Sequence, residues 1–318
     1  MSRRVLVVGD IVTDIVAVHS GVLAVDSDTP ARITATAGGS AANTAAWLAD
    51  AGVAVSLLGV VGADAAGAQR IAELAAVGVD CSPVVHSPTT PTGTIIVLTD
   101  GRNRTMVADR GANHDLRPGW VDDSFAGLPD LAHLHLSGYT LLHASSRGAG
   151  LRALELARAR GIPTSVDAAS AAPLREHARA LLDWVAGVDL LLANLDEARI
   201  LAVAADSTVD DAPAAVAAVL ARTVGEVVVK LGPGGALWTR ADQTRVVAAE
   251  PATVVDTTGA GDAFAAGLIA ARLAGTGIDA SLAEAVRLGT AAVGLLGGRP
   301  PAAPQQSTAR PARLSRDR

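Results

Sequence analysis

The chain has 318 residues, half of them apolar, so it is long enough to bury the core of one large α/β domain. Its acidic net charge of −6 disfavours nucleic acid as a partner, and its single cysteine, Cys81, excludes an internal disulfide and a cysteine-rich zinc site. The apolar runs are too short for a signal peptide or a membrane span, so we expect a cytoplasmic protein without a membrane partner.

The first third of the chain predicts alternating strands and helices, interrupted by β-rich segments. In chain order we expect a strand at 4–8, β-rich segments at 11–18 and 31–36, a helix at 40–51, a strand at 55–60, a helix at 64–76, and β-rich segments at 94–99 and 105–108. The β-rich segments do not fit the alternation around them. We therefore expect them to form a small sheet outside the main domain.

From residue 131 the alternation of strands and helices is regular. We expect strands at 131–137, 163–167, 190–193 and 227–231, and helices at 145–160, 173–184, 195–204, 212–223, 260–273 and 281–296. This order implies right-handed βαβ units and therefore a mainly parallel sheet. Residues 299–318 are rich in Pro, Gln, Ser and Arg without apolar periodicity, so we expect a disordered tail after a single domain at 1–298.

A glycine-containing turn runs directly into an apolar helix at 256–268, DTTGAGDAFAAGL. The free N–H groups at a helix start, together with the helix dipole, make an anion site, and glycine lets a phosphate approach closely. Asp262 lies in this turn. It either caps the first turn of the helix or stands beside a phosphate to accept a hydroxyl proton. No GxxxxGK[ST] sequence occurs, which excludes a Walker-type P-loop.

Two features of the N-terminal half are candidate partners for this turn. The segment GGSAAN at 38–43 also runs into a helix, and it is either an ordinary glycine-rich loop or a ligand contact. Asp14 lies in a β-rich segment, where an aspartate is atypical, so it occupies an exposed edge or contacts a ligand.

The sequences GGSAANTAAWLADAG and DTTGAGDAFAAGL resemble, in order and separation, the two signatures of the PfkB, or ribokinase-like, carbohydrate kinases. GDIVTD near the start, RGAN, NLDE and VVVKLGPGGALW fit the same family, and the resemblance covers residues 4–298. It implies a three-layer α/β/α domain with a mainly parallel central sheet. It also implies a small β-sheet lid, from about 11–36 and 92–112, that covers the substrate and pairs with a second lid in a homodimer.

The resemblance further implies ATP-dependent phosphorylation of a hydroxymethyl group of a sugar or sugar-like substrate, with ATP and Mg²⁺ as cofactors. Asp262 matches the catalytic base of the family. The anion hole for the transferring phosphate is matched by Gly259, Ala260 and Gly261. These roles agree with the second interpretation of the turn, in which Asp262 accepts a hydroxyl proton.

The remaining matches are to binding positions of the family. The substrate side is matched by Asp14, Gly38, Gly39 and Asn43, and the nucleotide side by Asn194, Lys230, Gly232 and Gly235. Glu197 matches an acid that organises Mg²⁺ through water. Asp256 and Thr258 match positions that bind a monovalent cation, K⁺, in many members, with the rest of that site near 292–298. The alternative for Asn194 and Glu197 is a helix N-cap followed by a first-turn acid.

Other functions stay open at this point. A nucleoside kinase of the same family and a non-catalytic relative that binds sugar or nucleotide are the alternatives, and the seven aromatic residues offer little for stacking on a nucleobase. A Rossmann oxidoreductase is disfavoured, because no GxGxxG follows the first strand and Asp10 stands where a glycine is needed. Val12 stands where ribose-specific members often carry a polar residue, which puts ribose in doubt. Three arginines lie in or near the expected lid: Arg32, Arg104 and Arg110. They either bind an anionic group of the substrate or are solvated surface residues.

Overall fold

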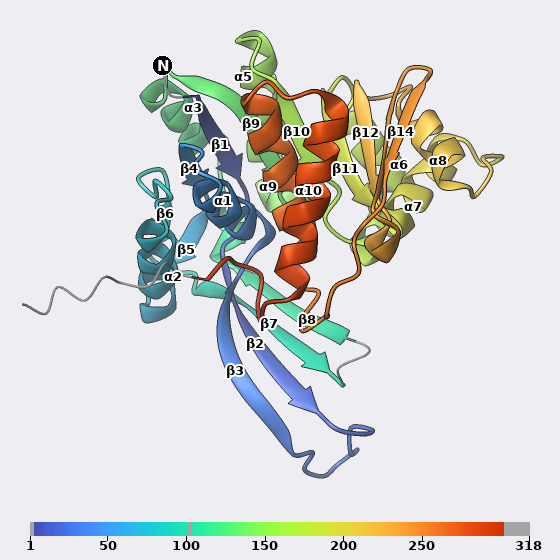
Figure 1. Ribbon diagram of the computed structural model, residues 1–318. Helices are drawn as coiled ribbons and strands as arrows, with labels where there is room; N and C mark the ends of the chain where they lie inside the picture. Colours follow the sequence, from blue (N-terminus) through green and yellow to red (C-terminus); the bar gives the residue numbers. More distant parts are fainter. Residues whose placement is uncertain (1–2, 101–103, 302–318) are drawn as a thin grey trace, which may run out of the picture.

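The computed structural model describes residues 3–100 and 104–301, which form a large α/β body and a smaller sheet that projects from it (Figure 1). Within these residues the central sheet has eight strands, in the spatial order β14-β13-β12-β11-β10-β9-β1-β4. Their bounds are β1 Arg4–Val8, β4 Val55–Leu58, β9 Leu131–Ser137, β10 Thr164–Asp167, β11 Leu190–Asn194, β12 Glu226–Lys230, β13 Ala236–Arg240 and β14 Gln243–Val247. Within this sheet the six strands β4, β1, β9, β10, β11 and β12 run parallel to one another, which confirms the expected mainly parallel sheet.

Helices cover both faces of the sheet and complete the three layers (Figure 1). One face carries α1 (Ser40–Asp50), α9 (Ala260–Leu273) and α10 (Ile278–Val293). The other carries α3 (Pro118–Gly127), the short α4 (Tyr139–Leu142), α5 (Ala144–Ala159), α6 (Ala171–Trp184), α7 (Leu195–Ala205) and α8 (Pro213–Leu220). Alternate residues of β1 face the two layers, and burial on both faces explains why such strands are apolar throughout. None of the described helices is long and apolar enough to cross a membrane.

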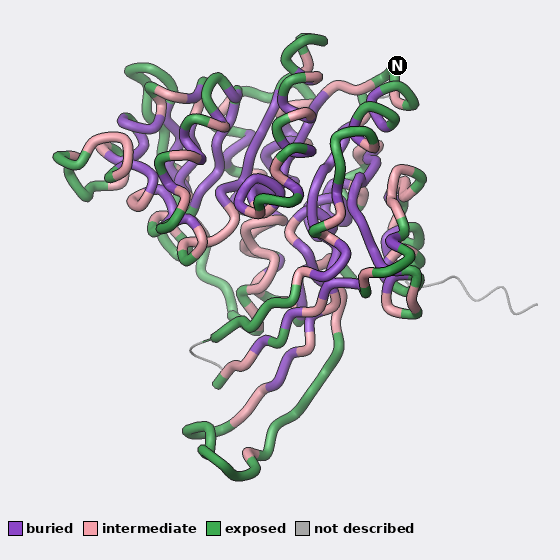
Figure 2. Tube along the Cα trace, turned by 180° about the vertical axis from the view of Figure 1, so that it is seen from behind, coloured by how far each residue is buried: buried purple, intermediate pink, exposed green. Residues whose placement is uncertain are grey.

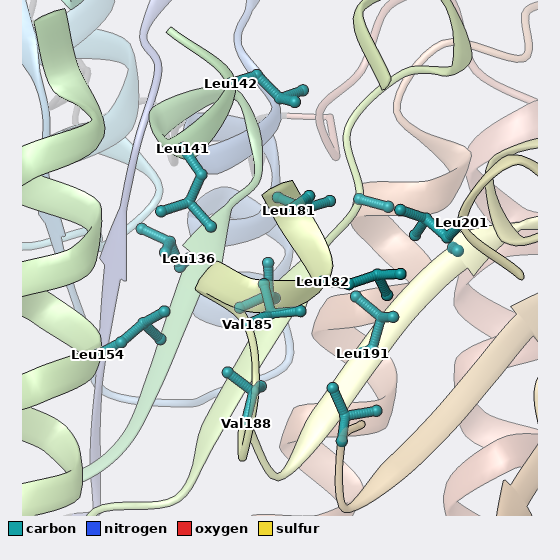
Figure 3. Close-up of a cluster of buried hydrophobic side chains, with 14 of the residues drawn as sticks. Leu136, Leu141, Leu142, Leu154, Leu181, Leu182, Val185, Val188, Leu191 and Leu201 are labelled. Carbon is teal, nitrogen blue, oxygen red and sulfur yellow. The ribbon is translucent and has the colours of Figure 1, made fainter. Parts of the chain in front are cut away.

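The larger core cluster lies between the sheet and the second layer of helices. Figure 3 shows its leucines and valines, among them Leu136 of β9, Leu154 of α5 and Leu181 of α6. The cluster is built mainly from Ala, Val and Leu, as expected for a chain with few aromatic residues. This packing holds the carboxyl ends of the parallel strands at one edge of the body.

The lid is a four-stranded sheet in the order β3-β2-β7-β8. Its strands are β2 (Val12–His19), β3 (Ala31–Gly38), β7 (Thr92–Thr99) and β8 (Arg104–Gly111), which confirms a small sheet separate from the main one. Asp14 pairs with Thr36 and Ile95, and it shares a face with the buried Val16 and Val97. Figure 2 shows that much of this sheet is exposed away from the body.

Several elements were not expected from the sequence. Helix α3 begins at a proline in its first turn and carries glycines, which weakens its helical pattern, yet Phe125 anchors it in the core. The sequence did not predict the hairpin of β13 and β14, because β14 is a largely exposed edge strand without apolar alternation. The strand expected at 55–60 divides at Gly59 into β4 and β5 (Val60–Gly62), which pairs with β6 (Val85–Ser87). Helix α2 (Ala65–Ala76) and the short turns η1 (Ala112–Asp115) and η2 (Gly232–Gly234) complete the described elements.

The packed part of the chain extends beyond the expected start of the tail. Helix α10 ends at Val293, but Arg299 is hydrogen-bonded to residues of the body and Pro300 is buried. The expectation that the tail begins at 299 was therefore wrong at its first residues, because composition does not show that an arginine finds buried partners. The rest of the expected tail, from residue 302, lies outside the described residues.

Candidate active site

Polar side chains gather where the parallel strands end and where helices α1 and α9 begin. In open α/β sheets, ligands bind outside the carboxyl ends of the strands. The side chains at or just after these strand ends are Asp10, Ser137, Asp167, Asn194 and Lys230. Asp262 reaches the same region from α9, and Asp14 reaches it from the lid.

The glycine-rich turn before α9 has the geometry of an anion site. Gly259 is the N-cap of α9 with a φ of 75°, a left-handed conformation that favours glycine. A Cβ at this position would also collide with the backbone of Gly298. No side chain caps the helix here, so its first N–H groups are available to an anion.

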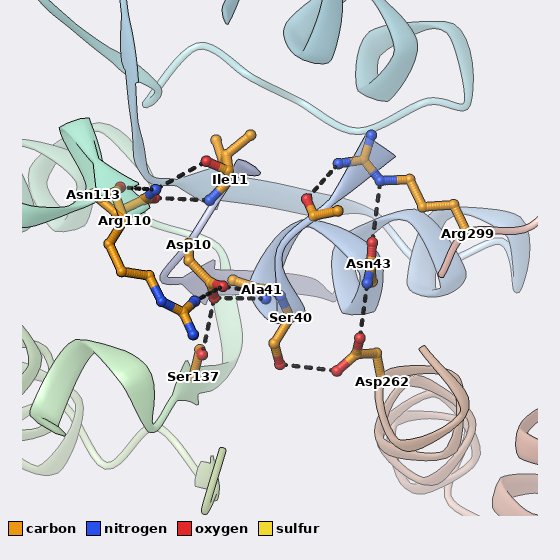
Figure 4. Close-up of polar contacts among 11 residues, drawn as sticks. Asp10, Ile11, Ser40, Ala41, Asn43, Arg110, Asn113, Ser137, Asp262 and Arg299 are labelled. Carbon is orange, nitrogen blue, oxygen red and sulfur yellow. Dashed lines mark hydrogen bonds and ion pairs between the residues drawn. The ribbon is translucent and has the colours of Figure 1, made fainter. Parts of the chain in front are cut away.

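Asp262 faces helix α1 rather than capping its own helix. Its Oδ1 accepts a hydrogen bond from Ser40 Oγ at 2.8 Å, and its Oδ2 accepts one from Asn43 Nδ2 at 2.9 Å (Figure 4). Burial raises the pKa of Asp262 to about 7, against the lowering effect of these two hydrogen bonds. The carboxylate therefore titrates near neutral pH, in the range suited to general-base chemistry.

Asp10 is a site residue that the sequence analysis missed. It is 4% exposed, and its Oδ2 pairs with Arg110 Nη1 at 3.0 Å and accepts the N–H of Ser40 at 3.2 Å. Its Oδ1 accepts hydrogen bonds from Ala41 N and Ser137 Oγ (Figure 4). The available signal was an aspartate two residues after the first buried strand, within the GDIVTD sequence.

Arg110 belongs to the wall of the site. It is the only lid arginine of our three candidates with a mostly buried side chain, 13% exposed, and its guanidinium lies 3.7 Å from the centre of the Tyr139 ring. The alternative of a freely solvated side chain therefore does not apply to Arg110. Arg104 is exposed and donates to Thr258 Oγ1 at 3.3 Å, so it links the lid to the turn before α9.

Asp14 is buried, so it does not occupy an exposed edge. Its carboxylate lies against Gly38, where a Cβ would collide with it, and Gly39 has a φ of 97° and packs on the backbone of Asp10. Burial, followed by the charge of Asp10, raises the pKa of Asp14 to about 6. Within the described residues no group donates a hydrogen bond to the Asp14 carboxylate, which leaves its oxygens available to a ligand.

Lys230 forms a largely buried ion pair at the end of β12. Its Nζ lies 2.6 Å from Asp167 Oδ2, and a Cβ at Gly261 would come within 3.0 Å of the same ammonium. Burial alone would lower the pKa of Lys230, but the carboxylates of Asp167 and Glu197 outweigh it and raise this pKa. Gly232, with a φ of 57°, and Gly235, with a φ of 88°, shape the turn that follows, and a Cβ on Gly235 would collide with β14.

Asn194 and Glu197 form a capping box at the start of α7. Asn194 Oδ1 accepts the N–H of Glu197, and the Glu197 carboxylate accepts from both the N–H and the side-chain amide of Asn194. The structure therefore has the N-cap arrangement that we gave as the alternative. Among the described residues no cluster of three or more His, Cys, Asp or Glu side chains forms a metal cage.

Asp256 lies beside the segment that follows α10. Its Oδ1 accepts the N–H of Thr258 at 2.9 Å, and its Oδ2 accepts the N–H of Gly297 at 3.1 Å. Its own N–H donates to the carbonyl of Val293. The segment around 292–298 and the turn before α9 are thus neighbours.

The comparisons with known proteins agree with this arrangement. Residues 2–305 match the pfkB family carbohydrate kinases. The chain is 33% identical over 268 residues to a 2-dehydro-3-deoxygluconokinase of Thermoproteus tenax, covering 81% of this chain and 80% of that one. It is 29% identical to a deoxyribokinase of Salmonella typhi over 71% of each chain.

Solved structures show the same fold. A putative ribokinase II from E. coli in its apo form superposes with a TM-score of 0.82 at 27% identity, covering 95% of this chain and 96% of that one. The same E. coli protein in complex with ATP and Mg²⁺ gives a TM-score of 0.80 at 26% identity over 94% of each chain. By its sequence and its fold, the chain belongs to the pfkB family of carbohydrate kinases, as its two glycine-rich motifs predicted.

Proposed function

We propose that this kinase transfers the γ-phosphoryl group of ATP to a hydroxymethyl group of a sugar or sugar-like acceptor, with Asp262 as the general base. The observation that carries the proposal is the half-buried Asp262 carboxylate, which accepts hydrogen bonds from Ser40 and Asn43 of α1 and directly follows the glycine-rich turn. The relatives support the reaction class, since they are named as kinases of sugars and of a sugar acid, and one E. coli relative holds ATP and Mg²⁺.

In the proposed reaction the acceptor oxygen forms a bond to the γ-phosphorus while the bond from that phosphorus to the β–γ bridging oxygen breaks. Asp262 takes the acceptor proton, and ADP leaves. The N–H groups of Gly259, Ala260 and Gly261 bind the oxygens of the transferring group. Lys230, whose ammonium lies against Gly261, adds positive charge on the nucleotide side.

The binding roles follow from the same geometry. Asp14 accepts hydrogen bonds from acceptor hydroxyls, while Gly38 and Gly39 let the backbone approach the sugar and Asn43 orients the base. Asn194 and Glu197 would hold Mg²⁺ through water, and Mg²⁺ neutralises phosphate charge when it is bound. Asp256 and Thr258, beside the C-terminal segment, would hold the monovalent cation.

A coupled assay of ADP release across sugars, sugar acids, sugar phosphates and nucleosides tests the acceptor class. The panel includes acids because the partly buried Arg110 lies in the wall of the site. Nucleosides are the second candidate, but the Tyr139 ring is already covered by Arg110 and is not free on that side for stacking. If none of the acceptors in the panel supports ADP release, the alternative of a non-catalytic relative that binds sugar or nucleotide would be favoured.

The substitution Asp262→Asn tests the base. It keeps the shape of the side chain but removes the proton acceptor, so kcat should fall by about 10²- to 10⁴-fold. The melting temperature should be kept, because the neutral side chain removes a buried charge. The matched control is Asp279→Asn, since Asp279 is also in the first turn of a helix, α10, but is exposed. A folded Asp262→Asn variant with near wild-type kcat would exclude Asp262 as the base.

A further inference from the structure

The segment that follows α10, Gly297 to Pro300, passes between helix α1 and the start of α9. The carbonyl of Gly298 accepts a hydrogen bond from Trp47 Nε1 of α1 at 3.0 Å. A Cβ on Gly298 would collide with the carboxamide of Asn43, and a Cβ on Gly259 would collide with Gly298. The segment is therefore in close contact with helix α1, which faces Asp262, and with the start of α9, which carries Asp262.

Arg299 is the charged residue of this segment, and its guanidinium is directed into the body. Its Nε donates to Asn43 Oδ1 at 3.3 Å, and its Nη2 donates to the carbonyl of Gly38 at 3.1 Å (Figure 4). Its Nη1 lies 3.9 Å from Glu73 Oε2, and the side chain is only 11% exposed. An arginine with these contacts is part of the architecture of the site, not a solvated surface residue.

These contacts determine which end of the Asn43 carboxamide faces Asp262. A carboxamide has one acceptor end and one donor end. Arg299 occupies the acceptor, Oδ1, so the donor, Nδ2, points to Asp262 and lies 2.9 Å from its Oδ2. If the carboxamide turned over, Oδ1 would face the Asp262 carboxylate, and two acceptors would oppose each other.

We propose that Arg299 is a positioning residue for phosphoryl transfer: it holds the Asn43 carboxamide in the orientation that serves Asp262 and holds the Gly38 carbonyl of the substrate loop. This inference rests on the proposed function, because it takes Asp262 as the base. It assigns a role in the active site to a residue that, from composition, was expected to begin the tail.

The pH dependence of kcat reports on this role. Two neutral donors, Ser40 and Asn43, and two charged groups, Asp167 on β10 and Lys230 on β12, act on Asp262. Burial and Asp167 raise the pKa of Asp262, while Asn43, Ser40 and Lys230 lower it. Loss of the Asn43 donor should therefore raise this pKa, so that the acid limb of the kcat profile moves to higher pH. Using kcat rather than kcat/KM limits the contribution of free-enzyme groups such as Asp14.

Two substitutions separate positioning from charge. Arg299→Met removes both the fork of donors and the charge, whereas Arg299→Lys keeps a charge beside Glu73 but cannot reproduce two directed hydrogen bonds. We expect both variants to lose about 10- to 100-fold in kcat, as for a displaced catalytic group. Both should also shift the acid limb to higher pH. Arg287→Lys is the matched control, because Arg287 is an exposed arginine on α10.

The double variant tests whether Arg299 acts through Asn43. In an Asn43→Ala background, adding Arg299→Met should move the acid limb no further, and a second shift of the same size would overturn the proposal. A wild-type profile for the Lys variant would also overturn it, because charge alone would then suffice. If the Met variant does not fold, the Lys variant decides alone. Failure of the proposed function is distinct: Asp262→Asn would then retain its kcat, whatever the Arg299 variants do.

Discussion

Two carboxylates of the candidate site, Asp14 and Asp262, lower the stability of the fold when they are ionised. Burial raises the pKa of Asp14 to about 6 and that of Asp262 to about 7, from an ordinary value of 3.8. Between about pH 4 and these values the folded chain holds protons that the unfolded chain has released, so the free energy of unfolding falls as pH rises. The ionised site at neutral pH is therefore less stable than the protonated one.

At the residue scale we predict that Asp14→Asn impairs use of the sugar far more than binding of ATP. The neutral side chain loses a charge-assisted hydrogen bond to a hydroxyl, worth about 1.5–3 kcal/mol, so the sugar KM should rise tenfold or more. At pH 8 the melting temperature should be equal or higher, because a buried charge is removed. Steady-state kinetics, ATP titration calorimetry and thermal melts measure these three quantities.

The control for this variant is Asp28→Asn, which changes an exposed aspartate of the same lid. It should leave the sugar KM unchanged. Asp14 has no role in the sugar site if Asp14→Asn also leaves the sugar KM unchanged, or if it weakens ATP and sugar equally.

At the element scale, the site is assembled by helix starts and loops that approach each other closely. Helix α1 supplies the donors to Asp262, α9 supplies the carboxylate itself, and the segment after α10 lies between them. Glycines at 259 and 298 permit this approach, since a Cβ at either would collide with a neighbouring element. The three elements therefore depend on one another for their positions.

This dependence predicts different effects of two truncations. A chain that stops after residue 301 keeps Arg299 and Pro300, so its activity and melting temperature should match those of the full chain. A chain that stops after Gly298 loses the contacts to Asn43 and Gly38, so its kcat should fall by about 10- to 100-fold. Equal activity of the two truncated chains, measured by ADP release, would contradict this expectation.

At the scale of the whole molecule, the lid presents two different faces. Asp14 lies on the face that carries the buried Val16 and Val97. On the opposite face the cross-strand neighbours Ile96 and Val107 are 42% and 57% exposed, and Ile33 of β3 is 67% exposed. Several apolar side chains exposed on one face of a sheet favour association with another surface, and pairing of two lids would shield them from water.

We predict a twofold symmetric dimer that forms through this outer face of the lid. The double substitution Ile33→Lys and Val107→Lys should yield a monomer, because buried ammonium groups would oppose each other across the interface. Light scattering at micromolar concentration measures the molar mass of the wild-type chain and of the double variant. Val203→Lys is the control, since Val203 is exposed on α7 of the body. A wild-type chain that is monomeric at this concentration would contradict the prediction.

The sequence by itself determined the fold class and the position of the glycine-rich turn before α9, because both depend on local patterns. Strands buried on both faces are apolar throughout, and their alternation with helices permits only a mainly parallel sheet. Glycines before an apolar helix likewise indicate a helix start open to an anion. Weak local patterns, such as the exposed strand β14, gave no such signal.

Only the tertiary structure decided which side chains meet. Asp262 bonds to Ser40 and Asn43, which lie 222 and 219 residues away, and Asp10 bonds to Arg110, 100 residues away. Arg299, which composition placed in the tail, holds Asn43 across 256 residues. Such pairs depend on how the packed layers bring strand ends, helix starts and loops to one edge of the sheet, and no periodicity within a short window carries that information.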